Sequence, residues 1–155
     1  MSPSLRLSFD SAPFAGATFG GLPIQVIVAD DHGLLRRSLR LLLDHECDLD
    51  VIAEAEDLAS TERHVERLRP AVLVLDLRMP GGSSVEVIGR LRERVPETQI
   101  VVLTMERNAG FARRALAAGA LGFVLKDQAD VELPAAVRAA AHAQEYVSPS
   151  VGQSI

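Results

Sequence analysis

The stretch LVLDLRMPGG, Leu73 to Gly82, joins an apolar run to a turn, and Asp76 lies where the run stops. An apolar run that is continuous rather than alternating is typical of a strand buried on both faces of a parallel sheet. Asp is also a common turn residue, so an acid at this point has a purely structural explanation. The remainder of the chain decides between a turn residue and a chemical site.

Length and composition limit the classes of protein to consider. The chain has 155 residues, 48% of them hydrophobic and 24% charged, as expected for one folded domain. Its one cysteine, Cys47, cannot form an internal disulfide, which favours a cytoplasmic location. No apolar run approaches the roughly 18 residues that span a bilayer, so no membrane partner is expected. The net charge of −5 argues against nucleic-acid binding by this chain's own surface.

Short apolar runs alternate with segments of helical period over most of the chain. The predicted strands are 24–29, 51–55, 71–75, 100–103 and 121–125. Two of the predicted helices are marked by an apolar stripe, one at Leu35, Leu39, Leu42 and Leu43 and the other at Val85, Ile88, Leu91 and Val95. The other three predicted helices are the segments 60–69, 108–118 and 131–144. Five strands alternating with five helices predict an α/β domain with a parallel sheet and right-handed crossovers.

Reactive side chains follow four of the predicted strands. Asp30 and Asp31 end the first, Asp76 the third, Thr104 the fourth and Lys126 the fifth. In a parallel sheet these positions meet at one edge, where α/β proteins bind their ligands. Taken singly, each has a structural explanation, since Asp31 or Thr104 can cap a helix and Lys126 can lay its stem on the core.

Together, these residues form a set suited to phosphoryl transfer. Three crowded carboxylates repel one another unless a cation lies between them, and Mg²⁺ prefers such an oxygen-rich site. A hydroxyl and an ammonium opposite the acids are suited to hold phosphoryl oxygens. A carboxylate that contacts the metal can act as a nucleophile and form an acyl phosphate.

The chain resembles the receiver domain of two-component response regulators, and more narrowly the NarL/FixJ (LuxR-type) branch. The segments VIVADDHGLLRRSLRLLL, VLVLDLRMPGG, VVLT and GALGFVLKD occur in the order of that family, and the similarity covers residues 22–149. The resemblance implies a flavodoxin-like α/β fold with a five-stranded parallel sheet, order 2-1-3-4-5, and five helices.

The resemblance also implies a role for each site residue. Asp76 would be the phosphoacceptor, Thr104 and Lys126 would hold the phosphoryl group, and Phe123 would be the switch aromatic. The Mg²⁺ ligands would be Asp30, Asp31, Asp76 and the backbone carbonyl of Arg78. The phosphoryl donor would be a sensor histidine kinase, and the domain would be no enzyme beyond its own phosphorylation and dephosphorylation.

The ends of the chain are expected to lie outside the receiver. Residues 1–22, rich in Ser, Gly, Ala and Pro, predict a flexible extension, residues 23–146 the receiver, and residues 147–155 the start of a linker. In this family such a linker precedes a helix-turn-helix domain, which is absent here, so DNA binding is expected only through that missing domain. A homodimer is a further partner that the resemblance allows.

Two departures from the family pattern lie beside Asp76. Receivers often carry Met-Pro-x-x-Asp-Gly, whereas residues 79–84 are MPGGSS. We expect the loop to turn at Gly81 and Gly82, with Ser83 or Ser84 capping the next helix. Met105, where many receivers have a smaller residue, is expected to narrow access to the phosphate and slow its hydrolysis.

Two other functions remain open from sequence. A receiver-like interaction module that no longer takes phosphate is one, kept open by the altered loop. A phosphatase of the haloacid dehalogenase type also uses a strand-end Asp and Mg²⁺, but it needs a second acid two residues later, where this chain has Arg78. The four histidines show no paired metal spacing and are expected on helix surfaces, although His32 directly follows Asp31.

Overall fold

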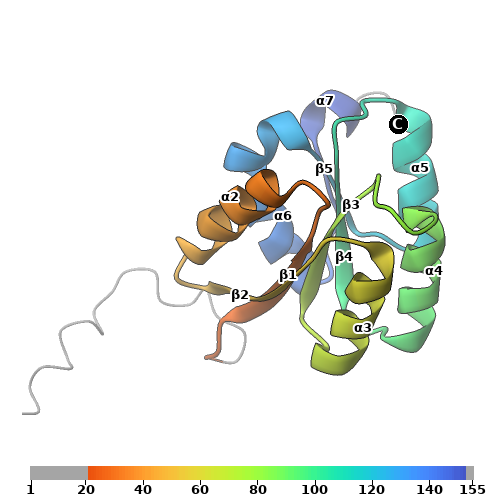
Figure 1. Cartoon of the computed structure of the whole chain (residues 1–155). Helices are drawn as coiled ribbons and strands as arrows, with labels where there is room; N and C mark the ends of the chain where they lie inside the picture. The colour runs from red at the N-terminus through yellow and green to blue at the C-terminus, as the bar shows by residue number, and fades with distance from the viewer. Residues whose placement is uncertain (1–20, 153–155) are drawn as a thin grey trace, which may run out of the picture.

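The computed structural model describes residues 21–152 and places a sheet between two layers of helices (Figure 1). Its strands are β1 (Ile24–Ala29), β2 (Leu49–Ala55), β3 (Val72–Asp76), β4 (Gln99–Thr104), β5 (Gly122–Leu125) and β6 (Tyr146–Val147). Its helices are α2 (Gly33–Asp44), α3 (Leu58–Leu68), α4 (Ser84–Arg94), α5 (Ala109–Ala118), α6 (Ala129–Ala141) and α7 (Pro149–Gly152), with a 3₁₀ turn, η1 (Lys126–Gln128), after β5.

The sheet is entirely parallel, in the order β2-β1-β3-β4-β5-β6. The predicted order 2-1-3-4-5 is confirmed for the first five strands. The prediction of five strands and five helices is wrong, because the described residues form six of each. The sixth strand has only two residues, too few to show a periodic pattern, and backbone hydrogen bonds from Tyr146 and Ser148 attach it to the edge of β5.

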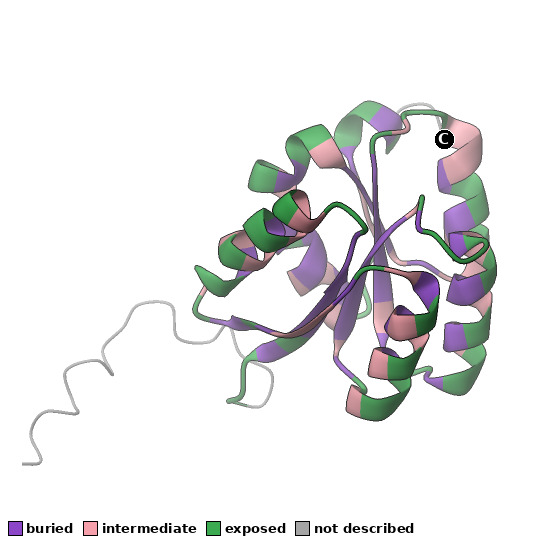
Figure 2. Ribbon diagram, in the orientation of Figure 1, coloured by how far each residue is buried: buried purple, intermediate pink, exposed green. Residues whose placement is uncertain are grey.

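Helices α2 and α6 cover one face of the sheet, and α3, α4 and α5 cover the other (Figure 1). The central strands are buried along their length (Figure 2). Side chains of β3 alternate between the two faces: Leu73 and Leu75 pack in one apolar cluster, and Val72 and Val74 pack in the other. Burial on both faces explains why the run that precedes Asp76 is continuously apolar. Within residues 21–152, no helix has the length and hydropathy to cross a membrane.

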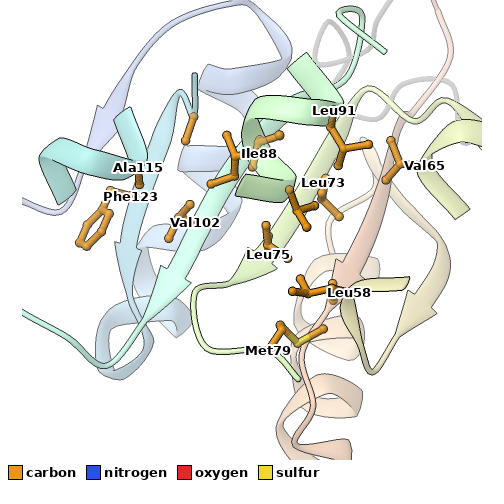
Figure 3. Close-up of a cluster of buried hydrophobic side chains, with 14 of the residues drawn as sticks. Leu58, Val65, Leu73, Leu75, Met79, Ile88, Leu91, Val102, Ala115 and Phe123 are labelled. Atoms are coloured by element: carbon orange, nitrogen blue, oxygen red, sulfur yellow. The ribbon is translucent and has the colours of Figure 1, made fainter. Parts of the chain in front are cut away.

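Figure 3 shows the cluster beneath α3, α4 and α5, with Phe123 of β5 among its side chains. Phe123 is fully buried and shares this cluster with Ala115 of α5 and Val151 of α7. The predicted switch aromatic is therefore a core residue, and any rotation of its ring has to displace packed neighbours.

The loop after β3 turns as predicted. Gly81 and Gly82 have φ of +105° and +133°, in the left-handed region that glycine tolerates at little cost. Ser83 then caps α4 by accepting a hydrogen bond from the Glu86 N–H at 3.3 Å. The turn and the cap together fix the path of the chain immediately after Asp76.

Residues 146–152, here called the C-terminal segment, pack against the domain. Ser148 is fully buried; its Oγ accepts a hydrogen bond from the Leu125 N–H at 3.1 Å and donates one to Glu132 of α6 at 2.5 Å. Val151 is buried as well. Part of the predicted linker thus forms ordered structure, while residues 153–155 and most of the predicted N-terminal extension lie outside the described residues.

Replacing Ser148 by alanine is expected to destabilise the domain by about 1–3 kcal/mol, because it leaves the buried Leu125 N–H without an acceptor. Urea denaturation of Ser148→Ala beside Ser150→Ala, an exposed serine on α7, measures the difference. The Ser150 variant should stay within about 0.5 kcal/mol of the unmodified chain. Equal stability of the two variants would contradict the account of the C-terminal segment.

Candidate functional site

The carboxyl edge of the sheet holds five of the predicted site residues. Asp76 and Thr104 end β3 and β4, while Asp30, Asp31 and Lys126 follow β1 and β5 directly. Strands β1, β3, β4 and β5 are consecutive neighbours, so these side chains come out at one edge. The sequence prediction that this edge gathers acids, a hydroxyl and an amine agrees with the arrangement of the strands.

A single ammonium group lies between two buried carboxylates. Lys126 Nζ is 3.1 Å from Asp30 Oδ2 and 3.1 Å from Asp76 Oδ2. Only 8% of the Lys126 side chain is exposed, and the two carboxylates are almost fully enclosed. Since one positive charge faces two negative charges, with Asp31 adding a third nearby, the pocket formed by Asp30, Asp31, Asp76 and Lys126 carries excess negative charge. We call it the acidic pocket.

Burial raises the pKa of Asp76 above its ordinary value. A hydrogen bond from the Arg78 N–H to Asp76 Oδ1, 3.1 Å long, and the charge of Lys126 act against this rise, whereas the neighbouring Asp30 adds to it. The ionised form of Asp76 is thus poorly solvated, and a cation at the pocket would stabilise it.

Asp30 is held rigidly, but one of its oxygens lacks a hydrogen bond. The Arg36 guanidinium donates to the Asp30 carbonyl at 2.6 Å, and the His32 N–H donates to Asp30 Oδ1 at 2.9 Å. Asp30 Oδ2 is buried and accepts no hydrogen bond from the described residues, although the Lys126 ammonium lies 3.1 Å away as an ion pair. This oxygen therefore has the shared ammonium as an ion-pair partner and can still take a metal ligand bond.

The acidic pocket fits Mg²⁺. Mg²⁺ takes oxygen ligands, usually from one or two carboxylates plus water and phosphate oxygens. Carboxylate oxygens of Asp30, Asp31 and Asp76, together with a ring nitrogen of His32, all lie within 4.8 Å of one another. A divalent cation would neutralise the excess negative charge and could be bound by the Asp30 oxygen that accepts no hydrogen bond from the described residues.

The other predicted residues take separate positions around this pocket. Thr104 is buried at the end of β4, and its hydroxyl accepts a hydrogen bond from the Glu106 N–H at 3.0 Å. Arg78 contacts Asp76 through its backbone N–H, and metal binding by its carbonyl stays a prediction. Phe123 is a fully buried member of the apolar cluster beneath α3, α4 and α5.

Sequence reasoning missed four contacts made by residues that follow the strand ends or lie close to them in sequence, two of them from His32. His32 Nδ1 lies 3.2 Å from Asp31 and 3.3 Å from Asp30. The other two are loop ion pairs, Arg107–Asp127 at 2.5 Å and Arg78–Glu106 at 3.5 Å. Both ion pairs are largely exposed, so each contributes little to stability. The position of His32 directly after the acids was the one available signal; the ion pairs join residues 20 and 28 positions apart and leave no local pattern.

Known sequences that are similar to this chain are those of response regulators. A family model described as "Response regulator receiver domain" matches residues 26–138. The oxygen regulatory protein NreC of Staphylococcus epidermidis is 34% identical over 133 residues, which are 85% of this chain and 61% of that protein. The chain therefore spans about three fifths of the length of the curated relatives that it matches.

Solved structures agree in fold and sequence. A LuxR-family response regulator from Aurantimonas superposes with a TM-score of 0.81 at 30% identity, over 84% of this chain and 94% of that chain. The isolated receiver domain of RcsB from Salmonella enterica was solved with the phosphomimetic BeF₃⁻. It superposes with a TM-score of 0.78 at 30% identity, over 84% of this chain and 97% of that chain. Receiver domains are signalling domains that generally bind Mg²⁺ at an acidic pocket. With this pocket at the carboxyl edge of the same fold, the chain belongs to the response regulator receiver family, as a receiver domain of the NarL/LuxR type.

Proposed function

We propose that this receiver takes a phosphoryl group from a sensor histidine kinase onto Asp76, with Mg²⁺ held by Asp30, Asp31, Asp76 and the carbonyl of Arg78. The observation that carries the proposal is the buried triad at the strand edge, with Lys126 Nζ 3.1 Å from both Asp76 and Asp30. One oxygen of Asp76 faces this ammonium, and the other accepts the Arg78 N–H.

The chemistry proposed is an in-line displacement at phosphorus. An Asp76 oxygen forms the new bond to phosphorus while the bond to the kinase imidazole nitrogen breaks, and the electron pair of that bond returns to the ring. Lys126 would pair with a phosphoryl oxygen, and the Thr104 hydroxyl would donate a hydrogen bond to another. Bound Mg²⁺ would supply positive charge for the equatorial oxygens.

The response proposed is a two-state switch. An acyl phosphate on Asp76 would draw Thr104 inward and let the buried Phe123 ring rotate into the vacated space. The carbonyl of Phe123 accepts a hydrogen bond from the Ser148 N–H at 2.8 Å. A change at Phe123 would therefore reach the C-terminal segment through this backbone contact, as well as the surface formed by α5, β5 and α6.

The partners proposed follow from the relatives. RcsB has been solved as dimers bound to DNA. For this chain we propose a homodimer, and DNA binding only through a helix-turn-helix domain beyond the linker. We propose a cytoplasmic location as well, and keep the division into extension 1–22, receiver 23–146 and linker 147–155, with residues 147–152 of that linker packed on the receiver.

Phosphorylation of Asp76 is testable by intact mass. Incubation with acetyl phosphate and Mg²⁺ should add one phosphoryl group to the chain, labile to hydroxylamine and absent without Mg²⁺. Asp76→Asn should show no adduct, whereas Asp50→Asn, at the opposite end of the sheet, should be modified like the unmodified chain. An adduct that persists in Asp76→Asn would move the acceptor elsewhere. No adduct, with no Mg²⁺ binding, would favour the phosphate-independent interaction module.

Removing the Asp76 charge is expected to stabilise the metal-free domain. Burial raises the pKa of Asp76 in the folded domain above its value in the unfolded chain. Protonation of Asp76 therefore stabilises the folded domain in acid, and this stabilisation is lost as the pH rises through the folded pKa. At neutral pH the ionised group therefore costs stability, and Asp76→Asn should raise the free energy of unfolding by on the order of 1 kcal/mol. This gain in the free energy of unfolding should shrink as the pH falls below the usual pKa range of a carboxyl group.

Urea denaturation of both chains at neutral and acid pH, with EDTA and then with Mg²⁺, measures this effect. Mg²⁺ should stabilise the unmodified chain more than Asp76→Asn, because the variant lacks one ligand. A loss of stability in Asp76→Asn at neutral pH, or a difference that does not change with pH, would show that the burial of this charge is not costly.

A further inference from the structure

A nitrogen ligand lies beside the oxygen ligands of the acidic pocket. His32 is the residue that precedes α2, and its side chain forms no capping hydrogen bond to that helix. Its Nδ1 lies 3.2 Å from an Asp31 oxygen and 3.3 Å from an Asp30 oxygen. The imidazole is 69% exposed, so it can turn without disturbing packed neighbours.

We propose that His32 makes the acidic pocket a mixed nitrogen and oxygen site that binds Mn²⁺, Co²⁺, Ni²⁺ or Zn²⁺ with the imidazole as a direct ligand. The inference rests on the proposed function, because it uses the same pocket. Imidazole suits these ions, whereas Mg²⁺ prefers oxygen ligands and keeps much of its water. His32 would therefore raise the affinity for the later transition metals far more than the affinity for Mg²⁺.

The geometry of the four residues fits one such ion. Ligand atoms of Asp30, Asp31, His32 and Asp76 lie within 4.8 Å of one another. Opposite ligands of an ion with bonds of about 2.1 Å are about 4.2 Å apart. Because His32 and Asp31 lie at the mouth of the pocket and are partly exposed, small side-chain rotations close the difference.

A second observation, on the hydrogen bonding of Asp30, also points to a cation here. Asp30 is fully buried, yet its Oδ2 accepts no hydrogen bond from the described residues. The Lys126 ammonium, 3.1 Å from this oxygen, is shared with Asp76 and offsets its charge only in part, so that a metal cation would complete the neutralisation. Asp30 Oδ1 contacts His32, so the two oxygens of this one carboxylate connect the imidazole to the inner part of the pocket.

The consequence is a competition between metals at the phosphorylation site. An ion held by His32 together with the three carboxylates would engage Asp76 as a ligand and occupy the position proposed for Mg²⁺. Nickel or zinc is therefore expected to compete with Mg²⁺ for the receiver, and His32 sets how strongly.

Metal titration of matched variants tests the proposal. All proteins carry Cys47→Ser, because the exposed thiol would bind Ni²⁺ itself. His32→Asn removes the imidazole and keeps a side chain that suits the start of a helix. His45→Asn removes an exposed histidine at the other end of α2 and serves as the control. Calorimetry with NiCl₂ and with MgCl₂ gives the two affinities for each protein.

The expected result is a loss of at least about tenfold in Ni²⁺ affinity for His32→Asn, with a change of less than about threefold for Mg²⁺. His45→Asn should match the parent for both ions. Pulsed electron paramagnetic resonance of the Mn²⁺ complex should show a ¹⁴N coupling in the parent protein that His32→Asn lacks.

Two results would overturn the inference, and they differ in what they say of the proposed function. If the parent binds Mg²⁺ but its ratio of Ni²⁺ to Mg²⁺ affinity is unchanged in His32→Asn, His32 is no ligand and the proposed function stands. If the parent binds neither ion at this pocket, both proposals fail together.

Discussion

The Lys126 ammonium group between the carboxylates of Asp30 and Asp76 is the interaction on which the site depends. A buried charge is tolerated only when paired, and one ammonium cannot fully neutralise two carboxylates. The three groups come from the ends of β1, β3 and β5, so the parallel order of the strands is what brings them together. The remaining negative charge favours a cation at the pocket. Burial, together with the neighbouring charge of Asp30, keeps the pKa of Asp76 raised.

Most of the fold could be predicted because the buried strands and amphipathic helices leave strong periodic patterns. Strand β1 matches its predicted range in full, and the glycine turn after Met79 is confirmed. The sixth strand and α7 could not be predicted in this way. Their two and four residues carry no period, and they form because backbone groups and Ser148 hydrogen-bond to β5 and α6. Such contacts depend on tertiary structure that a local pattern does not record.

The site could be predicted as a set because each acid, hydroxyl and amine directly follows a strand, and the carboxyl ends of parallel strands share an edge. The sequence could not show how these groups are partnered. That Lys126 contacts Asp30 as well as Asp76, or that His32 turns toward the acids, depends on side-chain directions fixed only in the folded chain. The burial of Phe123 in one cluster with Val151 likewise joins residues far apart in sequence.

The most direct test of the central claim is a crystal structure of this chain with Mg²⁺ and beryllium fluoride, an analogue of the phosphoryl group. The account predicts beryllium bonded to an Asp76 oxygen, a fluoride within hydrogen-bond distance of Lys126 Nζ, and Mg²⁺ bound by Asp30, Asp31 and Asp76. A crystal in which the analogue is absent or bound at another carboxylate, with the Lys126 contacts to Asp30 and Asp76 unchanged, would contradict it.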